Sequence, residues 1–90
     1  MLQEFLEKSV VVDTDCRFAY LGTLVKIEEK SLYLNQVCIY DPDLIRISLE
    51  QFLIESVKFG FSPSRNYLWI NRERVVAVSL LEHIIHAEKI

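Results

Sequence analysis

Glycine, proline and cysteine are scarce in this sequence, which has only two of each among its 90 residues. So little Gly and Pro excludes a low-complexity, disordered composition. The two glycines, Gly22 and Gly60, lie too far apart to form a phosphate-binding loop. Cys16 and Cys38 lack the paired spacing of a zinc site and do not make a disulfide framework. We therefore expect two free thiols in a reducing compartment.

Long apolar runs and an excess of positive charge are missing as well. No stretch approaches the roughly 18 consecutive apolar residues of a membrane helix. Glu4 and Glu7 interrupt the N-terminal apolar stretch, which argues against a signal peptide and predicts a cytoplasmic protein. The net charge of −3 counts against strong non-specific binding to nucleic acid or to a membrane surface. It leaves room for a local basic patch.

Apolar residues, by contrast, make up 51% of the chain. That is enough for a working core in one domain spanning residues 1–90. Alternating and β-branched apolar residues predict five strands, over 10–12, 17–27, 31–39, 67–70 and 74–80. Helical spacing predicts a short docked helix over 1–8 and a longer one over 48–59. The longer helix begins at a capping box of Ser48 and Gln51 and stops at Gly60.

Two features of the predicted strands carry tertiary information. Gly22 lies in mid-strand, where glycine marks a bend or a close approach of another backbone. The polar tip at 28–30 predicts a hairpin that places Leu24 near Leu34 and Cys38 near Leu21, away from Cys16. The last strand, 74–80, is rich enough in valine to predict burial on more than one side.

Two stretches resemble the motifs of the Sm-like family. Residues 20–28, followed by 32–34, have a Gly in the second strand, a Leu two residues on and an acidic residue at the strand end. Residues 69–78 form two short strands around a tight polar turn. Together with the N-terminal helix, the chain resembles a divergent bacterial-type member of the Sm-like (LSm/Hfq-type) family. The helix at 48–59 falls where that family accepts insertions.

The resemblance implies a mainly β fold: a five-stranded Sm-like or SH3-like barrel with an N-terminal helix and a helix inserted between strands 3 and 4. It also implies a homo-oligomeric ring in which the fourth strand of one subunit pairs with the fifth of the next. An apolar strand edge is a liability unless it is paired, so the pattern agrees. The residues expected at this interface are Trp69, Val75, Val76 and Val78.

The family further implies RNA binding by the two loops around the pore. The residues expected to contact single-stranded RNA here are Lys30, Tyr67, Arg72 and Arg74. The family's RNA-contacting Asn in the first loop and its Arg-Gly pair in the second are both absent, and residues 28–31 and 71–74 stand in their places.

Each of these sites has a second interpretation. The basic residues form a rim that contacts phosphates, or they are ordinary solvated charges paired with Glu28, Glu29 and Glu73. The rim residues are Arg72, Arg74, Lys26, Arg17 and Arg65. Tyr67 and Trp69 share one face of a strand and form a base-stacking platform, or they are core or interface aromatics. Two hypotheses stay open: an oligomeric binding or scaffold module associated with RNA, and a ring or dimer that has lost RNA binding and serves protein contacts.

No enzyme activity, metal, cofactor or small-molecule substrate is predicted. The acidic residues at 13–15 and 41–43 have the spacing of turns. His83 and His86 lie three apart but lack a third ligand. The inserted helix leaves Ile54, Phe59 and Phe61 outside its apolar stripe, and these residues would mark a partner surface if exposed.

Overall fold

The computed structural model describes residues 1–85 and shows a mainly β chain. Five antiparallel strands form one sheet in the order β4-β3-β2-β1-β5. The strands are β1 (Ser9–Thr14), β2 (Ala19–Ile27), β3 (Ser31–Tyr40), β4 (Arg65–Asn71) and β5 (Val75–Leu80). The helices are α1 (Leu49–Phe59) and the 3₁₀ helices η1 (Leu2–Phe5), η2 (Arg72–Arg74) and η3 (Leu81–His83). The five predicted strands and the helix between the third and fourth are thus confirmed.

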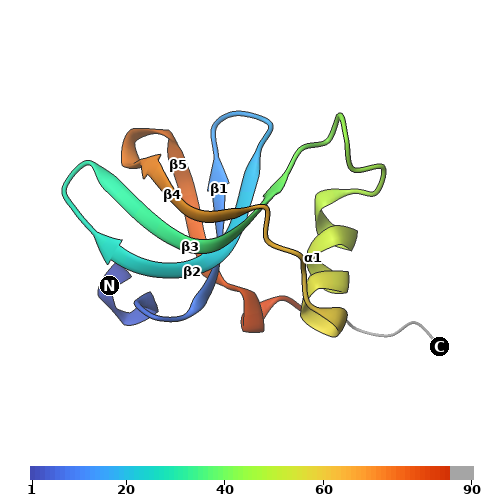
Figure 1. Ribbon diagram of the computed structural model, residues 1–90, viewed down its shortest axis with the longest axis horizontal. Coiled ribbons are helices and arrows are strands. Elements are labelled where there is room, and N and C mark those ends of the chain that lie inside the picture. The colour runs from blue at the N-terminus through green and yellow to red at the C-terminus, as the bar shows by residue number, and fades with distance from the viewer. Residues whose placement is uncertain (86–90) are drawn as a thin grey trace.

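The sheet curls because β2 and β3 bend together (Figure 1). A Cβ atom on Gly22 would lie 2.8 Å from the Asn35 carbonyl oxygen, so only glycine permits this approach. Opposite it, Gln36 adopts a φ of 51°, and the pairing register shifts between Leu21 and Thr23. The bend predicted from the mid-strand glycine is therefore present.

The predicted hairpin register holds on both sides of this bend. Leu24 pairs with Leu34, and Leu21 pairs with Cys38. Inside the curl lies the central core, which consists of Val10, Val12, Leu24, Leu32, Leu34, Val37, Ile70 and Leu80. The strands that supply these residues come from both ends of the chain, so the core depends on long-range pairing.

The N-terminal helix is shorter than the predicted span of 1–8. It ends at Phe5 as a 3₁₀ helix and packs Leu2, Phe5 and Leu6 against the central core. Beyond it, the Glu7 amide donates to the Leu24 carbonyl, and the Leu24 amide donates to the Lys8 carbonyl. Pairing with β2 thus takes up the backbone groups that a longer helix would have used.

A second core lies on the opposite face of the sheet, beneath α1. Val11 and Leu21 point to this face and are buried against Leu53 of α1 and Leu81 of η3. Because successive strand residues face opposite sides, the valine run of β1 is buried on both. Two-sided burial was predicted for 74–80 instead, and that was wrong. Val76 is 68% exposed because β5 lies at the edge of the sheet.

The ends of α1 follow the predicted signals with one difference. The Gln51 amide donates to the Ser48 hydroxyl, at 3.1 Å, and Gly60 ends the helix with a φ of 81°. The Gln51 side chain donates to Glu55 instead of reaching back to the N-cap, so the capping box is half formed. Phe59 is exposed, whereas Ile54 and Phe61 are half-buried. Within residues 1–85, no helix is long and apolar enough to cross a membrane.

Candidate assembly edges and loop surface

The two outermost strands of the sheet each have one unpaired edge. Among residues 1–85, β4 bonds only to β3 and β5 bonds only to β1, so the sheet is open between β4 and β5. Trp69 on β4 is 57% exposed and Val76 on β5 is 68% exposed. Val75 and Val78, by contrast, are half-buried against the central core. A row of free backbone donors and acceptors flanked by apolar side chains is a template for pairing with another strand.

Two adjoining hollows lie along the free edge of β4, and we call them together the β4 trough. The first, of about 510 Å³, lies between Phe18, Leu44 and Arg65. The second, of about 330 Å³, lies between Cys16, Trp69 and Arg74, and Tyr20 lines both. Tyr20 belongs to the partly buried rim of the central core. The trough is therefore the gap through which the interior of the curled sheet reaches solvent.

Arg72 joins the two loops at the far end of the sheet. Its backbone amide donates to the Lys30 carbonyl at 2.9 Å, and its guanidinium donates to the Glu28 carbonyl at 2.7 Å. Asn71 caps η2 by accepting the Glu73 amide, which explains why the predicted turn is a 3₁₀ helix. The β2–β3 tip and the β4–β5 turn consequently form one surface, opposite the end that α1 covers (Figure 1).

Acidic groups neutralise part of the positive charge on this loop surface. Glu28 accepts a hydrogen bond from Tyr33 at 2.9 Å and pairs with Lys26 at 3.4 Å, and these two contacts lower the pKa of its carboxyl. Arg74 pairs with Asp15 at 3.2 Å. The arginines predicted to contact RNA are thus engaged by acceptors of the protein itself, whereas Lys30 is exposed at the tip.

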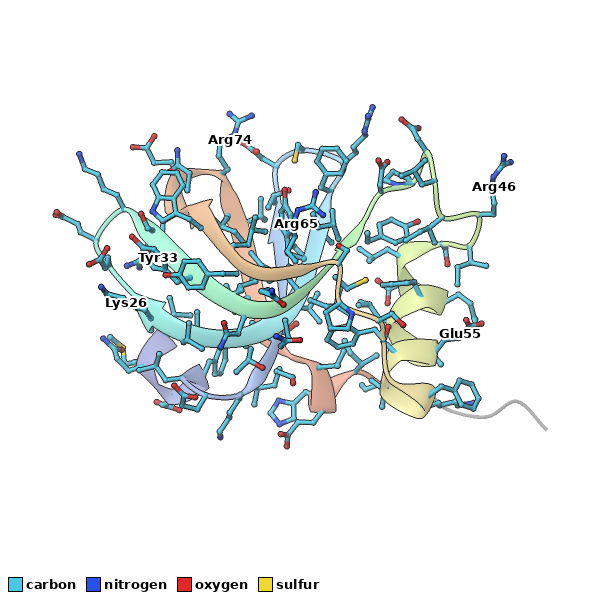
Figure 2. All side chains as sticks on the ribbon, viewed as in Figure 1. Lys26, Tyr33, Arg46, Glu55, Arg65 and Arg74 are labelled. Atoms are coloured by element: carbon cyan, nitrogen blue, oxygen red, sulfur yellow. The ribbon has the colours of Figure 1, made fainter. Side chains whose placement is uncertain are left out.

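Aromatic side chains cover the outer face of β3 and β4 beside this surface. Tyr67 and Trp69 are 54% and 57% exposed, which rules out the core interpretation and leaves the stacking-platform and interface interpretations open. Tyr33 pairs with Trp69 across the two strands, and its ring lies 5.7 Å from that of Tyr67. The Lys26 ammonium lies 5.5 Å from the centre of the Tyr33 ring. Figure 2 shows both side chains at the same end of the sheet. We call Lys26, Tyr33, Tyr67 and Trp69 the aromatic face.

The sequence interpretation missed Tyr33 as a member of this face. The available signal was the alternation of β3, because Leu32 and Leu34 are buried on either side of it. The pairing that brings Tyr33 to Trp69 was not visible, since it joins strands separated by the whole inserted helix.

Both cysteines are free, as predicted. Cys16 is exposed, and its pKa is lowered by a hydrogen bond with the Thr14 hydroxyl and another from the backbone of Phe18. The Thr14 hydroxyl has one proton to donate. When Cys16 is a neutral thiol, the hydroxyl donates to the Phe18 carbonyl, and when Cys16 is a thiolate, it donates to the sulfur. Burial raises the pKa of Cys38. The two thiols therefore differ in their tendency to ionise.

The acidic turn at 41–43 plays the expected structural role, whereas the turn expected to start at Asp13 begins later, because β1 continues to Thr14 by pairing with β2 and β5. Asp41 accepts the Asp43 amide, and both carboxylates face Arg17, at 4.0 and 3.0 Å. Among residues 1–85, no group of three His, Cys, Asp or Glu side chains is placed to hold a metal ion. His86, one of the two histidines considered as ligands, lies outside the described residues.

Comparison with solved structures identifies the architecture. The Sm protein of Pyrococcus abyssii, solved in complex with a uridine heptamer, superposes with a TM-score of 0.61 at 16% identity, covering 88% of this chain and 90% of that one. The chain has an Sm-like fold. One chain of the NatC complex bound to CoA gives a TM-score of 0.58 at 15% identity, covering 89% and 83%. A chain of NatC bound to Gag peptide and CoA gives 0.57 at 15%, covering 89% and 90%.

No protein-family model and no curated protein matches the sequence. The Sm-like fold confirms the predicted fold class. The bacterial type, the interface residues and the RNA-contact residues stay predictions. The structure places the latter in two groups: Arg72, Arg74 and Lys30 on the loop surface, and Tyr67 on the aromatic face.

Proposed function

We propose that this chain is a self-associating Sm-like module in which β4 of one copy pairs with β5 of the next. The unpaired edges of these two strands, with Val76 and Trp69 exposed on them, carry the proposal. Pairing would satisfy the free backbone groups and cover the trough, through which the central core now meets solvent. The product is a homo-oligomeric binding or scaffold module.

The test is the mass of the protein in solution, measured by light scattering over a range of concentrations. We expect the wild type to exceed the monomer mass and Val76→Lys to reduce it, because the lysine puts an uncompensated charge into the paired edge. Phe59→Lys is the matched control, since Phe59 is also apolar and exposed, at 83% against 68% for Val76, but lies at the end of α1 away from the β4 and β5 edges. A wild type that stays monomeric at all concentrations would contradict the proposal.

Single-stranded RNA is the second candidate, as the ligand of the assembled module. Its support is the exposed aromatic face with Lys26 beside it, together with the uridine heptamer bound by the Sm protein of similar fold. Arg72 donates to the Glu28 backbone carbonyl and Arg74 pairs with the Asp15 carboxylate, so both guanidinium groups already have partners. Stacking on the aromatic face therefore has better support than phosphate contacts from these arginines.

Fluorescence anisotropy with oligo-U and oligo-A at low and moderate salt tests this candidate. We expect Tyr67→Ala to weaken binding about tenfold, in line with the stacking energy of one base. Arg72→Ala should weaken it less. An assembled protein that binds neither oligonucleotide even at low salt would reject the RNA hypothesis. It would leave the alternative, a ring or dimer that serves protein contacts.

A further inference from the structure

We infer that the hollow at the start of β4 receives the segment that follows β5 in a second copy, held by an ion pair between Arg65 of one copy and Glu82 of the other. The inference rests on the β4–β5 association proposed above and names what fills its trough. The hollow holds about 510 Å³, and Phe18, Ile39 and Leu44 are among its walls. Leu44 is 77% exposed, so an apolar wall faces solvent in the separate chain.

Strand direction decides which part of the second copy reaches this hollow. Every neighbouring pair in the sheet is antiparallel, and antiparallel pairing is the form that tolerates water on one side. An antiparallel β5 brings its C-terminal end to Arg65, the first residue of β4. With β5 centred on β4, Leu80 and Leu81 lie beside Arg65, and Glu82 follows next to its guanidinium.

The charges on the two segments are complementary, and neither forms an ion pair among residues 1–85 of one chain. Within residues 1–85, the Arg65 guanidinium donates only to the Ser64 carbonyl, at 3.3 Å, whereas Arg17 and Arg74 pair with carboxylates. Glu82 is exposed on η3 and has no ion pair in the same range. It borders a different hollow, with Lys8 and Val57, so Arg65 and Glu82 of one chain do not share a surface.

An apolar residue three positions beyond Glu82 also fits the hollow. Ile85 is exposed in the separate chain and follows η3 directly after Ile84, which packs against the second core. With Glu82 at Arg65, Ile85 of the second copy would contact the apolar wall formed by Phe18 and Leu44. The segment therefore matches the hollow in both its charge and its apolar side chain.

Charge reversal tests the inference by sedimentation velocity on the full chain. We expect Arg65→Glu and Glu82→Arg each to weaken assembly about tenfold, because each places like charges together at the interface. The double variant should recover to within about threefold of wild type. The control is Arg46→Glu, which changes the net charge equally at an exposed position on the loop before α1 (Figure 2). It should leave assembly unchanged.

The outcomes separate this inference from the proposed function. If the wild type assembles and Arg65→Glu weakens assembly no more than Arg46→Glu, the inference is overturned while β4–β5 association stands. Single variants that weaken assembly without recovery in the double variant also overturn the ion pair. A monomeric wild type overturns the proposed function and the inference with it. Circular dichroism of each variant verifies that the exposed substitutions leave the fold intact.

Discussion

Glu28 determines the chemistry of the loop surface at the scale of a single residue. Its carboxylate accepts a hydrogen bond from the Tyr33 hydroxyl and pairs with the Lys26 ammonium, and its backbone carbonyl accepts a hydrogen bond from the Arg72 guanidinium. This one residue at the hairpin tip therefore binds the Lys26, Tyr33 and Arg72 donors that a phosphate group would otherwise contact. A protein with a neutral residue in its place would present a more basic surface, which is why we assign stacking rather than charge to the RNA candidate.

Asp13 gives a pH-dependent prediction. Burial and the nearby Glu50 carboxylate raise its pKa above the usual 3.8, so its ionised form destabilises the folded chain at neutral pH. The unfolded chain releases this proton at lower pH than the folded chain, so stability falls as pH rises from 3.8 through the raised pKa. We expect Asp13→Asn to be more stable than wild type at pH 7, with the difference disappearing below the usual value.

Urea unfolding of both proteins across this pH range measures the effect. Glu50→Gln serves as a companion variant, because removing the second cause of the shift should give part of the same gain at pH 7. A stability difference between wild type and Asp13→Asn that stays constant with pH would mean that ionisation of Asp13 is not its origin.

At the scale of elements, two features bury the two faces of the sheet: the bend of β2 and β3, and the helix α1. The bend lets the inner face enclose the central core, and α1 with η3 covers the outer face at one end. The inserted helix therefore closes a second core that the curled sheet alone would leave in water. It does so at the end opposite the loop surface (Figure 1), so it leaves the aromatic face and the β4 edge uncovered.

Gly22→Ala should destabilise the bend. The added Cβ would meet the Asn35 carbonyl oxygen at 2.8 Å, and backbone must move to relieve the contact. We expect a loss of about 2 kcal/mol in the free energy of unfolding, typical of overpacking a well-filled site. Chemical denaturation measures it.

The control for this bend is Gln36→Gly on the facing bulge. Gln36 has a φ of 51°, which glycine adopts without penalty, so this variant should be as stable as wild type or slightly more stable. Equal losses in the two variants would show that the bend does not depend on the missing side chain at position 22.

Leu53→Ala tests the cover that α1 provides. Leu53 is buried between α1 and the sheet, and truncation leaves a cavity in the second core. We expect a loss of about 2–4 kcal/mol. Phe59→Ala on the same helix removes an exposed side chain and should cost less than about 0.5 kcal/mol. A small loss for Leu53→Ala would mean that α1 contributes little to holding the sheet.

The whole molecule is an open curl with complementary edges. Its sheet begins at β4 and ends at β5, and the gap between them exposes apolar residues that face the core. Such a molecule would gain stability from closure, and in the proposed assembly a second copy of the chain supplies the strand that closes the gap. The proposal therefore links stability to assembly at this scale.

This linkage predicts a melting temperature that depends on protein concentration. Anything that binds only the folded chain stabilises it by mass action, and in the proposed assembly the binding partner is the chain itself. The wild type should melt at higher temperature as its concentration rises, and Val76→Lys should remove this dependence. Differential scanning calorimetry at two concentrations a hundredfold apart measures it. A wild-type melting temperature that is independent of concentration would contradict the linkage.

The sequence by itself determined the elements and the hairpin register. Local periodicity predicts the strands and the helix that begins after Ser48 and ends at Gly60. The bend follows from the glycine at position 22, and the pairing of Leu24 with Leu34 follows from the nearby hairpin turn. Errors arose where tertiary pairing prevailed over a local pattern. The N-terminal helix was cut short by pairing with β2, and the buried valines proved to be those of β1 rather than β5.

Only the tertiary structure decided which side chains meet across long stretches of sequence. The contact of Arg72 with the Glu28 carbonyl joins residues 44 positions apart, and the aromatic face joins β3 to β4 across the inserted helix. The β4 trough exists because the sheet stops at two edges, which is a property of the complete strand order and of no single strand. Local patterns fix which face of a strand is apolar, whereas the exposure of that face depends on whether another element covers it.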